Sequence, residues 1–172
     1  MLPPYETADT LARLERDIDA TGATAVICLG DSFDDPAASA DLDSDTSDWI
    51  ARLQAGREWI WVEGNHDPGA LGLSGTYRRE VSLNGLTLRH IAKPDAIGEV
   101  SGHYHPKARV GEVSRPCFLI DANRVLLPAY GTYTGGLRCW SEPLCSLMGA
   151  EALAVLTGER CIPVPMPRKE QA

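Results

Sequence analysis

Two of the four histidines in this chain sit one residue apart, in the stretch "SGHYHPKARV" at 101–110. The other two, His66 and His90, lie in "EGNHD" and "LRH", and an acidic stretch, "LGDSFDD", carries Asp31. Imidazole, carboxylate and amide oxygen together suit Mn, Fe or Zn, and a set without thiolate argues against a structural zinc site. These motifs therefore indicate a divalent-metal site.

The conformation of the H-x-H segment decides how its histidines are used. In an extended segment, His103 and His105 point the same way. If the chain turns sharply instead, they can bind two neighbouring ions. Gly30, Gly64 and Gly102 each come one or two residues before such a polar group. Glycine lets the backbone approach a crowded centre and adopts a positive φ at no steric cost.

Each motif alone has an ordinary explanation. Asp31 could cap a helix, Asn65-His66 could be a surface turn, His90 could be a half-buried strand-end histidine, and H-x-H need not hold a metal. The order GD, GNHD, H and GHxH along one chain favours a shared site. A mononuclear module of Asp31, Asn65, His90 and His103 remains an alternative.

The surrounding elements can bring these groups together. Alternating short apolar runs and helical patterns favour a layered α/β fold, and the later chain is rich in strands. Ligand sites in open α/β sheets form outside the carboxyl ends of strands, and each histidine lies at such an end. The expected helices are 7–22, 44–56 and 143–156, and the expected strand regions are 24–30, 58–64, a hairpin over 79–90 turning at Asn84-Gly85, 98–103, 117–130 and a final edge strand from 161.

Composition limits the function further. With 172 residues and 44% apolar content, we expect one domain over 1–165 and a flexible tail over 166–172. No membrane-spanning run or secretion signal is evident, and five scattered cysteines without a C-x-x-C pair indicate reduced thiols in a cytoplasmic protein. A net charge of −8 argues against a nucleic-acid-coating surface but not against a nuclease, because bound cations supply local positive charge.

The ordered motifs resemble those of the calcineurin-like metallophosphoesterase superfamily. The resemblance implies a two-sheet β-sandwich flanked by helices, with a two-metal site at the strand ends, Mn being the expected metal and Fe or Zn the alternatives. Asp31 would bridge both ions. Asn65, His90 and His103 would complete one ion's protein shell, and His105 would bind the other. His66 would protonate the leaving oxygen, oriented by Asp34.

A narrower resemblance covers nearly the whole chain. "LPPYET", "GDSFDD", "LQAGREWIWVEGNHD", "GHYHPKARV" and above all "LPAYGTYTGGL" look like the ligase-associated DNA-damage-response endonuclease family. This resemblance implies a metal-dependent phosphodiesterase that cleaves DNA, with DNA ligase- or helicase-associated repair proteins as partners.

One feature departs from the superfamily pattern. The superfamily opens with a strand ending in D-x-H, which binds the first ion, and no D-x-H occurs in this chain. We therefore expect the chain to be short at its N-terminus and to lack the first strand, which would leave an open sheet edge. One ion would then have only Asp31 and His105 as protein ligands. Alternative functions are a phosphomonoesterase, a cyclic-nucleotide phosphodiesterase and a non-catalytic scaffold with this fold.

Overall fold

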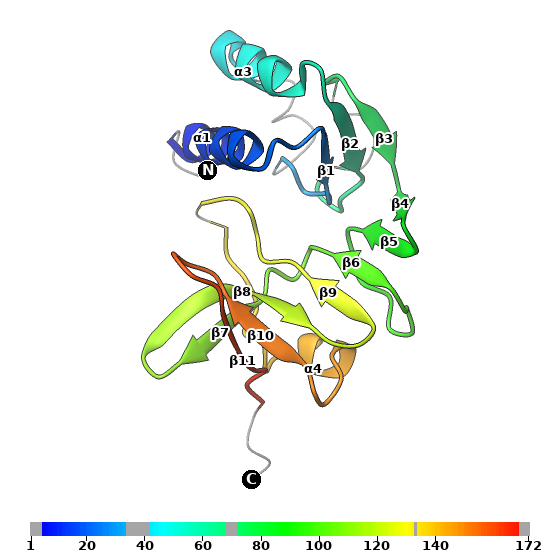
Figure 1. The fold of residues 1–172 in the computed structure, drawn as a ribbon, viewed down its shortest axis with the longest axis vertical. Coiled ribbons are helices and arrows are strands. Elements are labelled where there is room, and N and C mark those ends of the chain that lie inside the picture. The colour runs from blue at the N-terminus through cyan, green and yellow to red at the C-terminus, as the bar shows by residue number, and fades with distance from the viewer. Residues whose placement is uncertain (1–4, 34–41, 68–71, 133, 169–172) are drawn as a thin grey trace. The chain divides into compact units, whose positions relative to one another are not determined.

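A computed structural model describes residues 5–33, 42–67, 72–132 and 134–168. The chain divides into two compact units (Figure 1). The first unit is Met1–Glu80 with Tyr130–Tyr133, and the second is Val81–Ala129 with Thr134–Ala172. Of the predicted tail 166–172, the last four residues lie outside the described part of the chain.

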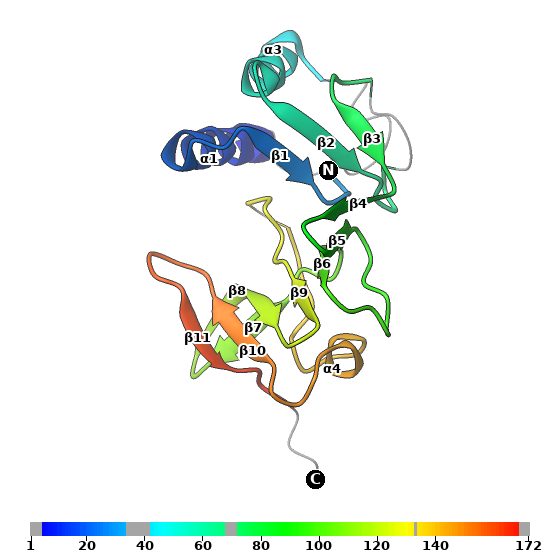
Figure 2. The same cartoon turned by 45° about the vertical axis from the view of Figure 1, so that its right-hand side comes forward.

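The first unit is built on a parallel sheet with strand order β1-β2-β3. Trp59 and Trp61 lie two residues apart on β2, so they share one face of the strand, and they pack against apolar residues of two helices. Both helices lie on the same side of the sheet (Figure 2). The elements are α1 (Tyr5–Thr21), β1 (Ala25–Cys28), α3 (Ser44–Gln54), β2 (Glu58–Val62) and β3 (Thr76–Arg78).

Local sequence signals set the ends of these helices. Gly22 has φ +62° directly after α1, and Gly56 has φ +73° just past α3. Asp43 caps α3, because its Oδ1 accepts a hydrogen bond from the Thr46 amide at 2.7 Å. The predicted helices 7–22 and 44–56 are therefore confirmed to within two residues. The run at 24–30 forms β1 as predicted, but as a half-buried edge strand rather than a buried one.

The second unit holds a mixed sheet of eight strands in the order β11-β10-β8-β9-β6-β5-β4, with β7 paired to β8. β5, β6 and β9 run parallel, while the β8 and β10 pairings are antiparallel. The elements are β4 (Glu80–Leu83), β5 (Leu86–Arg89), β6 (Glu99–Ser101), β7 (Lys107–Val110), β8 (Val113–Ile120), β9 (Arg124–Leu126), α4 (Leu144–Leu147), β10 (Leu153–Leu156) and β11 (Ile162–Pro165).

The core of the second unit is centred on β8 and its neighbours. Cys117 and Leu119 on β8, Leu126 on β9 and Leu144 on α4 have no exposed surface. The first half of β8 pairs with β7, and the second half pairs with β10. Ala92, two residues after His90, belongs to this core, and Tyr104, next to His103, packs against it.

Most of the predicted elements in this unit are confirmed. Asn84 and Gly85 both have positive φ, as the predicted tight hairpin turn requires. The final edge strand is confirmed as β11. The expected two-sheet α/β fold is confirmed as well.

The predicted helix over 143–156 is wrong. Only Leu144–Leu147 is helical, and Leu153–Leu156 forms β10 between β8 and β11. Ala154 and Leu156 alternate with more exposed residues, which is a strand pattern. Pairing with two neighbouring strands outweighs the helix propensity of "EALAVL", because tertiary contacts override weak local preference.

Candidate metal and phosphoester site

Two loops of the first unit leave the sheet at the same edge. β1 and β2 are parallel, with Cys28 opposite Trp61, so the chain turns out of both strands on the same side. The first loop carries Gly30 and Asp31, and the second carries the GNHD motif at 64–67. Both loops are polar, as the sequence predicted.

The carboxylate of Asp67 ties these two loops together. Asp67 is 3% exposed. Its Oδ1 accepts from the amides of Asp31 at 2.9 Å and Gly64 at 3.0 Å, and its Oδ2 accepts from Ser32 at 2.7 Å and Phe33 at 3.4 Å. One buried carboxylate therefore fixes the backbone that presents Asp31. Sequence reasoning gave Asp67 no role, although its place as the last residue of GNHD was a signal.

Asp31 and the second loop also contact each other directly. Oδ1 of Asp31 accepts from the His66 amide at 2.9 Å. A Cβ on Gly64 would overlap the amide and Oδ1 of Asp31 and Oδ1 of Asp67. The predicted need for glycine at 64 is thus confirmed. Asn65 and His66 are exposed beside this contact, whereas Asp34 lies outside the described residues.

In the second unit, two predicted ligands are brought together. His90 follows β5 and His103 follows β6, and these two strands pair in parallel. Nδ1 of His103 lies 3.1 Å from Nε2 of His90, and the rings meet edge to face with centroids 4.9 Å apart. His90 is 5% exposed, and its carbonyl accepts from the Gly102 amide at 3.1 Å.

The H-x-H segment turns rather than extends. The Tyr104 amide donates to the Gly102 carbonyl at 2.7 Å, and both His103 and His105 have positive φ, +60° and +46°. The two imidazoles therefore do not follow the alternation of a strand. Gly136 comes so close to the His105 carbonyl that a Cβ there would overlap it. The "TGGL" part of the long motif thus supports this turn.

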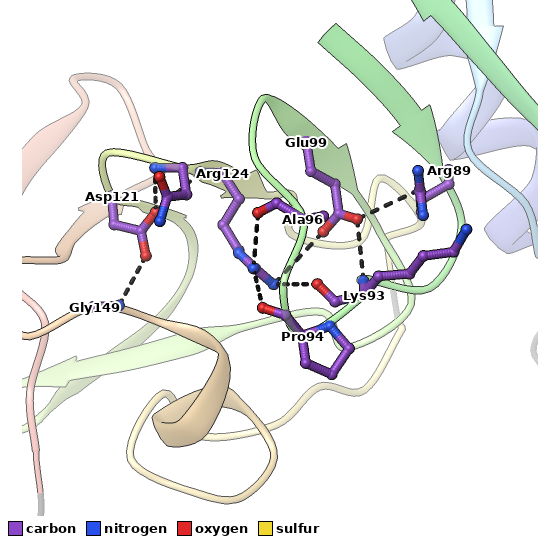
Figure 3. A network of polar contacts seen from close by, with 9 residues as sticks. Arg89, Lys93, Pro94, Ala96, Glu99, Asp121, Arg124 and Gly149 are labelled. Carbon is purple, nitrogen blue, oxygen red and sulfur yellow. Dashed lines mark hydrogen bonds and ion pairs between the residues drawn. The ribbon is translucent and has the colours of Figure 1, made fainter.

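A buried ion cluster holds the loop that follows His90 (Figure 3). Oε2 of Glu99 lies 3.4 Å from Nε of Arg89 and accepts from the Lys93 amide at 3.1 Å. Arg124 lies 3.7 Å from Oε1 of Glu99, and it donates to three carbonyls between Lys93 and Ala96. Since Arg89 precedes His90, this cluster restrains the backbone next to a predicted ligand.

Strained backbone coincides with the predicted ligands. Within the described residues, four non-glycine residues have positive φ: Asn84 in the hairpin turn, and Asp31, His103 and His105. A left-handed conformation costs a non-glycine residue roughly 1–2 kcal/mol, and such strain clusters at functional sites. Three of the five predicted ligands therefore have a backbone conformation that lowers the stability of the fold.

The chain matches the family model "Calcineurin-like phosphoesterase" over residues 5–152. It belongs to the calcineurin-like phosphoesterase family. A member of this family is a hydrolase that acts on phosphate esters, and the family uses divalent metals. The predicted superfamily and enzyme class are confirmed.

A solved structure also resembles this phosphoesterase. The crystal structure of Pseudomonas putida nuclease MPE matches with a TM-score of 0.69 and 29% sequence identity, covering 92% of this chain and 78% of that chain. Comparison with curated proteins finds no match. Within the described residues, no helix has the length and apolar character needed to cross a lipid bilayer.

The phosphoesterase's side chains fit a divalent metal. Two ligand atoms each about 2.1 Å from one ion lie roughly 3 Å apart, and the 3.1 Å between the His90 and His103 nitrogens agrees with this separation. Neutral imidazole and carboxylate are suitable donors for Mn, Fe or Zn. The paired histidines and the held Asp31 loop are thus two preformed groups of donors, one in each unit.

Proposed function

We propose that this phosphoesterase is a metal-dependent phosphodiesterase that cleaves DNA, and that it works in DNA repair. The proposed ligands of two divalent ions, with Mn as the expected metal, are Asp31, Asn65, His90, His103 and His105. The pairing of His90 with His103 at 3.1 Å carries the proposal, because these histidines are otherwise ordinary strand-end residues. Similarity to a bacterial nuclease supports the choice of nucleic acid as substrate.

Bound divalent ions would neutralise the phosphate and lower the pKa of an attacking water. The protein's own part is to position and to transfer a proton. Asp67 holds the Asp31 loop through three of its backbone amides and ties it to the second loop through the Gly64 amide, so that the carboxylate is oriented before the substrate arrives. The buried His90 keeps a fixed ring orientation through its contact with His103.

His66 is the proposed general acid. Its amide is anchored on Asp31, while the residue itself is exposed. An imidazolium at this place can donate its proton to the leaving alkoxide, a step typically worth about 10²–10⁴-fold in rate. Asp34 is the proposed partner that orients this imidazole.

The proposal has further parts. DNA ligase- or helicase-associated repair proteins are the proposed partners, on the basis of the motif resemblance. A cytoplasmic location is proposed because all five cysteines are free thiols, as in reducing compartments. We propose that residues 1–165 act as one phosphoesterase domain, since a single family model matches residues 5–152.

Metal dependence and ligand identity can be tested together. Hydrolysis of bis-p-nitrophenyl phosphate should require Mn²⁺ and stop with EDTA. The substitutions His90→Ala and His103→Ala should lower the metal content measured by mass spectrometry, whereas His66→Ala should abolish turnover and leave metal content intact. Full turnover after chelation would overturn the proposal. Comparing single-stranded DNA, a mononucleotide and a cyclic nucleotide identifies the substrate class.

A further inference from the structure

We propose that a basic groove on the second unit binds the phosphate backbone of single-stranded nucleic acid beyond the phosphate that is cleaved. This inference rests on the proposed phosphodiesterase function. The basic groove is a cavity of about 250 Å³ that no predicted ligand lines. Its lining residues are Lys107, Arg109, Glu112, Ser114, Arg138 and Trp140.

The strand register explains why these side chains meet. Lys107 and Arg109 lie two residues apart on β7 and therefore share one face of the strand. Arg109 is directly opposite Ser114 on β8. Lys107 forms a parallel bridge with Arg138, which brings a distant segment of the chain alongside β7. Three cations from two segments thus lie along one wall.

The charge of the basic groove favours an anion. Among the described residues, no carboxylate forms an ion pair with Lys107, Arg109 or Arg138. Lys107 Nζ donates to the Thr134 carbonyl at 3.5 Å, and Arg109 Nε donates to the Gly111 carbonyl at 2.9 Å. Glu112 is the single acidic residue of the lining. On a chain of net charge −8, a local excess of two positive charges is a specific feature.

Trp140 makes this arrangement suitable for a nucleic-acid strand. The guanidinium of Arg138 lies 5.5 Å from the Trp140 ring centroid, and a cation–π contact of this kind restricts the arginine to the wall of the groove. Single-stranded nucleic acid is bound by positively charged grooves in which planar groups accept bases. A row of cations beside an aromatic ring meets both requirements, whereas a lone phosphate would contact only one or two of the cations.

The basic groove continues directly from the H-x-H turn. Lys107 comes two residues after His105, and its amide donates to the Leu137 carbonyl at 2.7 Å. The Leu137 amide in turn donates to the Tyr104 carbonyl at 3.1 Å. The same backbone ladder therefore supports the turn and the groove. A strand whose phosphate is held at His105 would have its next phosphates beside Lys107 and Arg109.

The test measures binding of a fluorescent oligothymidylate to the full-length, Mn²⁺-loaded protein carrying His66→Ala, so that binding is read without cleavage. The groove variant combines Lys107→Gln, Arg109→Gln and Arg138→Gln. The control variant removes the same charge from exposed positions elsewhere, through Arg16→Gln, Arg52→Gln and Arg160→Gln.

The groove variant should bind about 10- to 100-fold more weakly near 0.1 M salt, because three phosphate contacts release counterions with a slope of about −0.7 each. The slope of log K against log salt should become less negative by about 2 in the groove variant, and by about 0.7 for each single substitution. The control variant should retain the original slope. In the background with His66 intact, turnover of bis-p-nitrophenyl phosphate should be unchanged in the groove variant.

Three outcomes would overturn the inference. The first is an unchanged slope in a groove variant with an unchanged melting temperature. The second is an equal loss in the control variant. The third is polyglutamate binding as tightly as the oligonucleotide through the same three cations, which would assign the groove to an acidic protein segment. Failure of the proposed function would instead show as absent bis-p-nitrophenyl phosphate hydrolysis with His66 in place.

Discussion

The substitution Asp67→Asn isolates the residue that fixes the Asp31 loop. An amide has nearly the same shape as the carboxylate but offers one acceptor oxygen instead of two. With its oxygen placed toward Asp31 and Gly64, its NH₂ group faces the donor amides of Ser32 and Phe33, which lie 2.7 and 3.4 Å from Oδ2. One strong and one weak hydrogen bond to a buried charge are then lost, at a cost of about 2–4 kcal/mol in the free energy of unfolding.

The same change at Asp121 is a matched control. In the second unit, Asp121 accepts from the amides of Asn123, Arg124 and Gly149 at 2.8–2.9 Å. Asp121→Asn should therefore cost about 1.5–3 kcal/mol, for one lost bond to Oδ2. No proposed ligand is held by Asp121, so its loss should leave catalysis intact.

Calorimetry and steady-state kinetics distinguish the two variants. Both should melt at lower temperature, but only Asp67→Asn should lower kcat/KM for bis-p-nitrophenyl phosphate at 25 °C. Because a displacement of a positioned group by about 1 Å can cost roughly 100-fold, we expect a loss of about 10- to 100-fold. Wild-type kcat/KM in destabilised Asp67→Asn would refute the positioning role. An equal kinetic loss in Asp121→Asn would mean that general loosening, not the Asp31 loop, is responsible.

Two further predictions concern the second unit. Gly136→Ala should lower kcat/KM, because the new Cβ displaces the His105 carbonyl. Gly135→Ala is the control, because a Cβ there meets open space, and it should leave kcat/KM unchanged. At pH 8, N-ethylmaleimide should label the exposed Cys161 and spare Cys117 in the folded protein, because burial raises the pKa of the Cys117 thiol to about 12 and keeps it protonated. Peptide mass spectrometry measures the labelling, and equal labelling of both thiols without denaturant would contradict it.

The sequence alone singles out the proposed metal ligands, because each stands at a local boundary. Asp31, Asn65 and His90 follow apolar runs that read as strands, and within each sheet the parallel pairing brings neighbouring strand ends to the same edge. The turn at Asn84-Gly85 was equally local. These features depend on a few neighbouring residues and on the alternation of apolar side chains.

Other features depend on partners far away in the chain. The β10 segment carries helix-forming residues, and only its pairing with β8 and β11 makes it a strand. The basic groove could not be predicted either, because Arg138 reaches Lys107 through a bridge between distant segments. The role of Asp67 requires knowing that four amides from two loops point at one carboxylate. In each case the deciding interaction is tertiary.

Both units use the same physical device to present a proposed ligand. Asp31 and His105 each occupy a left-handed conformation, and each is approached by a glycine, Gly64 or Gly136, at a distance that excludes a Cβ. Backbone contacts help to hold each strained residue: the Asp31 amide donates to Asp67, and the carbonyl of His105 abuts Gly136. Backbone contacts of this kind restrict the directions in which the side chain of a proposed ligand can point. The glycines are therefore expected to matter as much for catalysis as the ligands they support, although no glycine takes part in the chemistry.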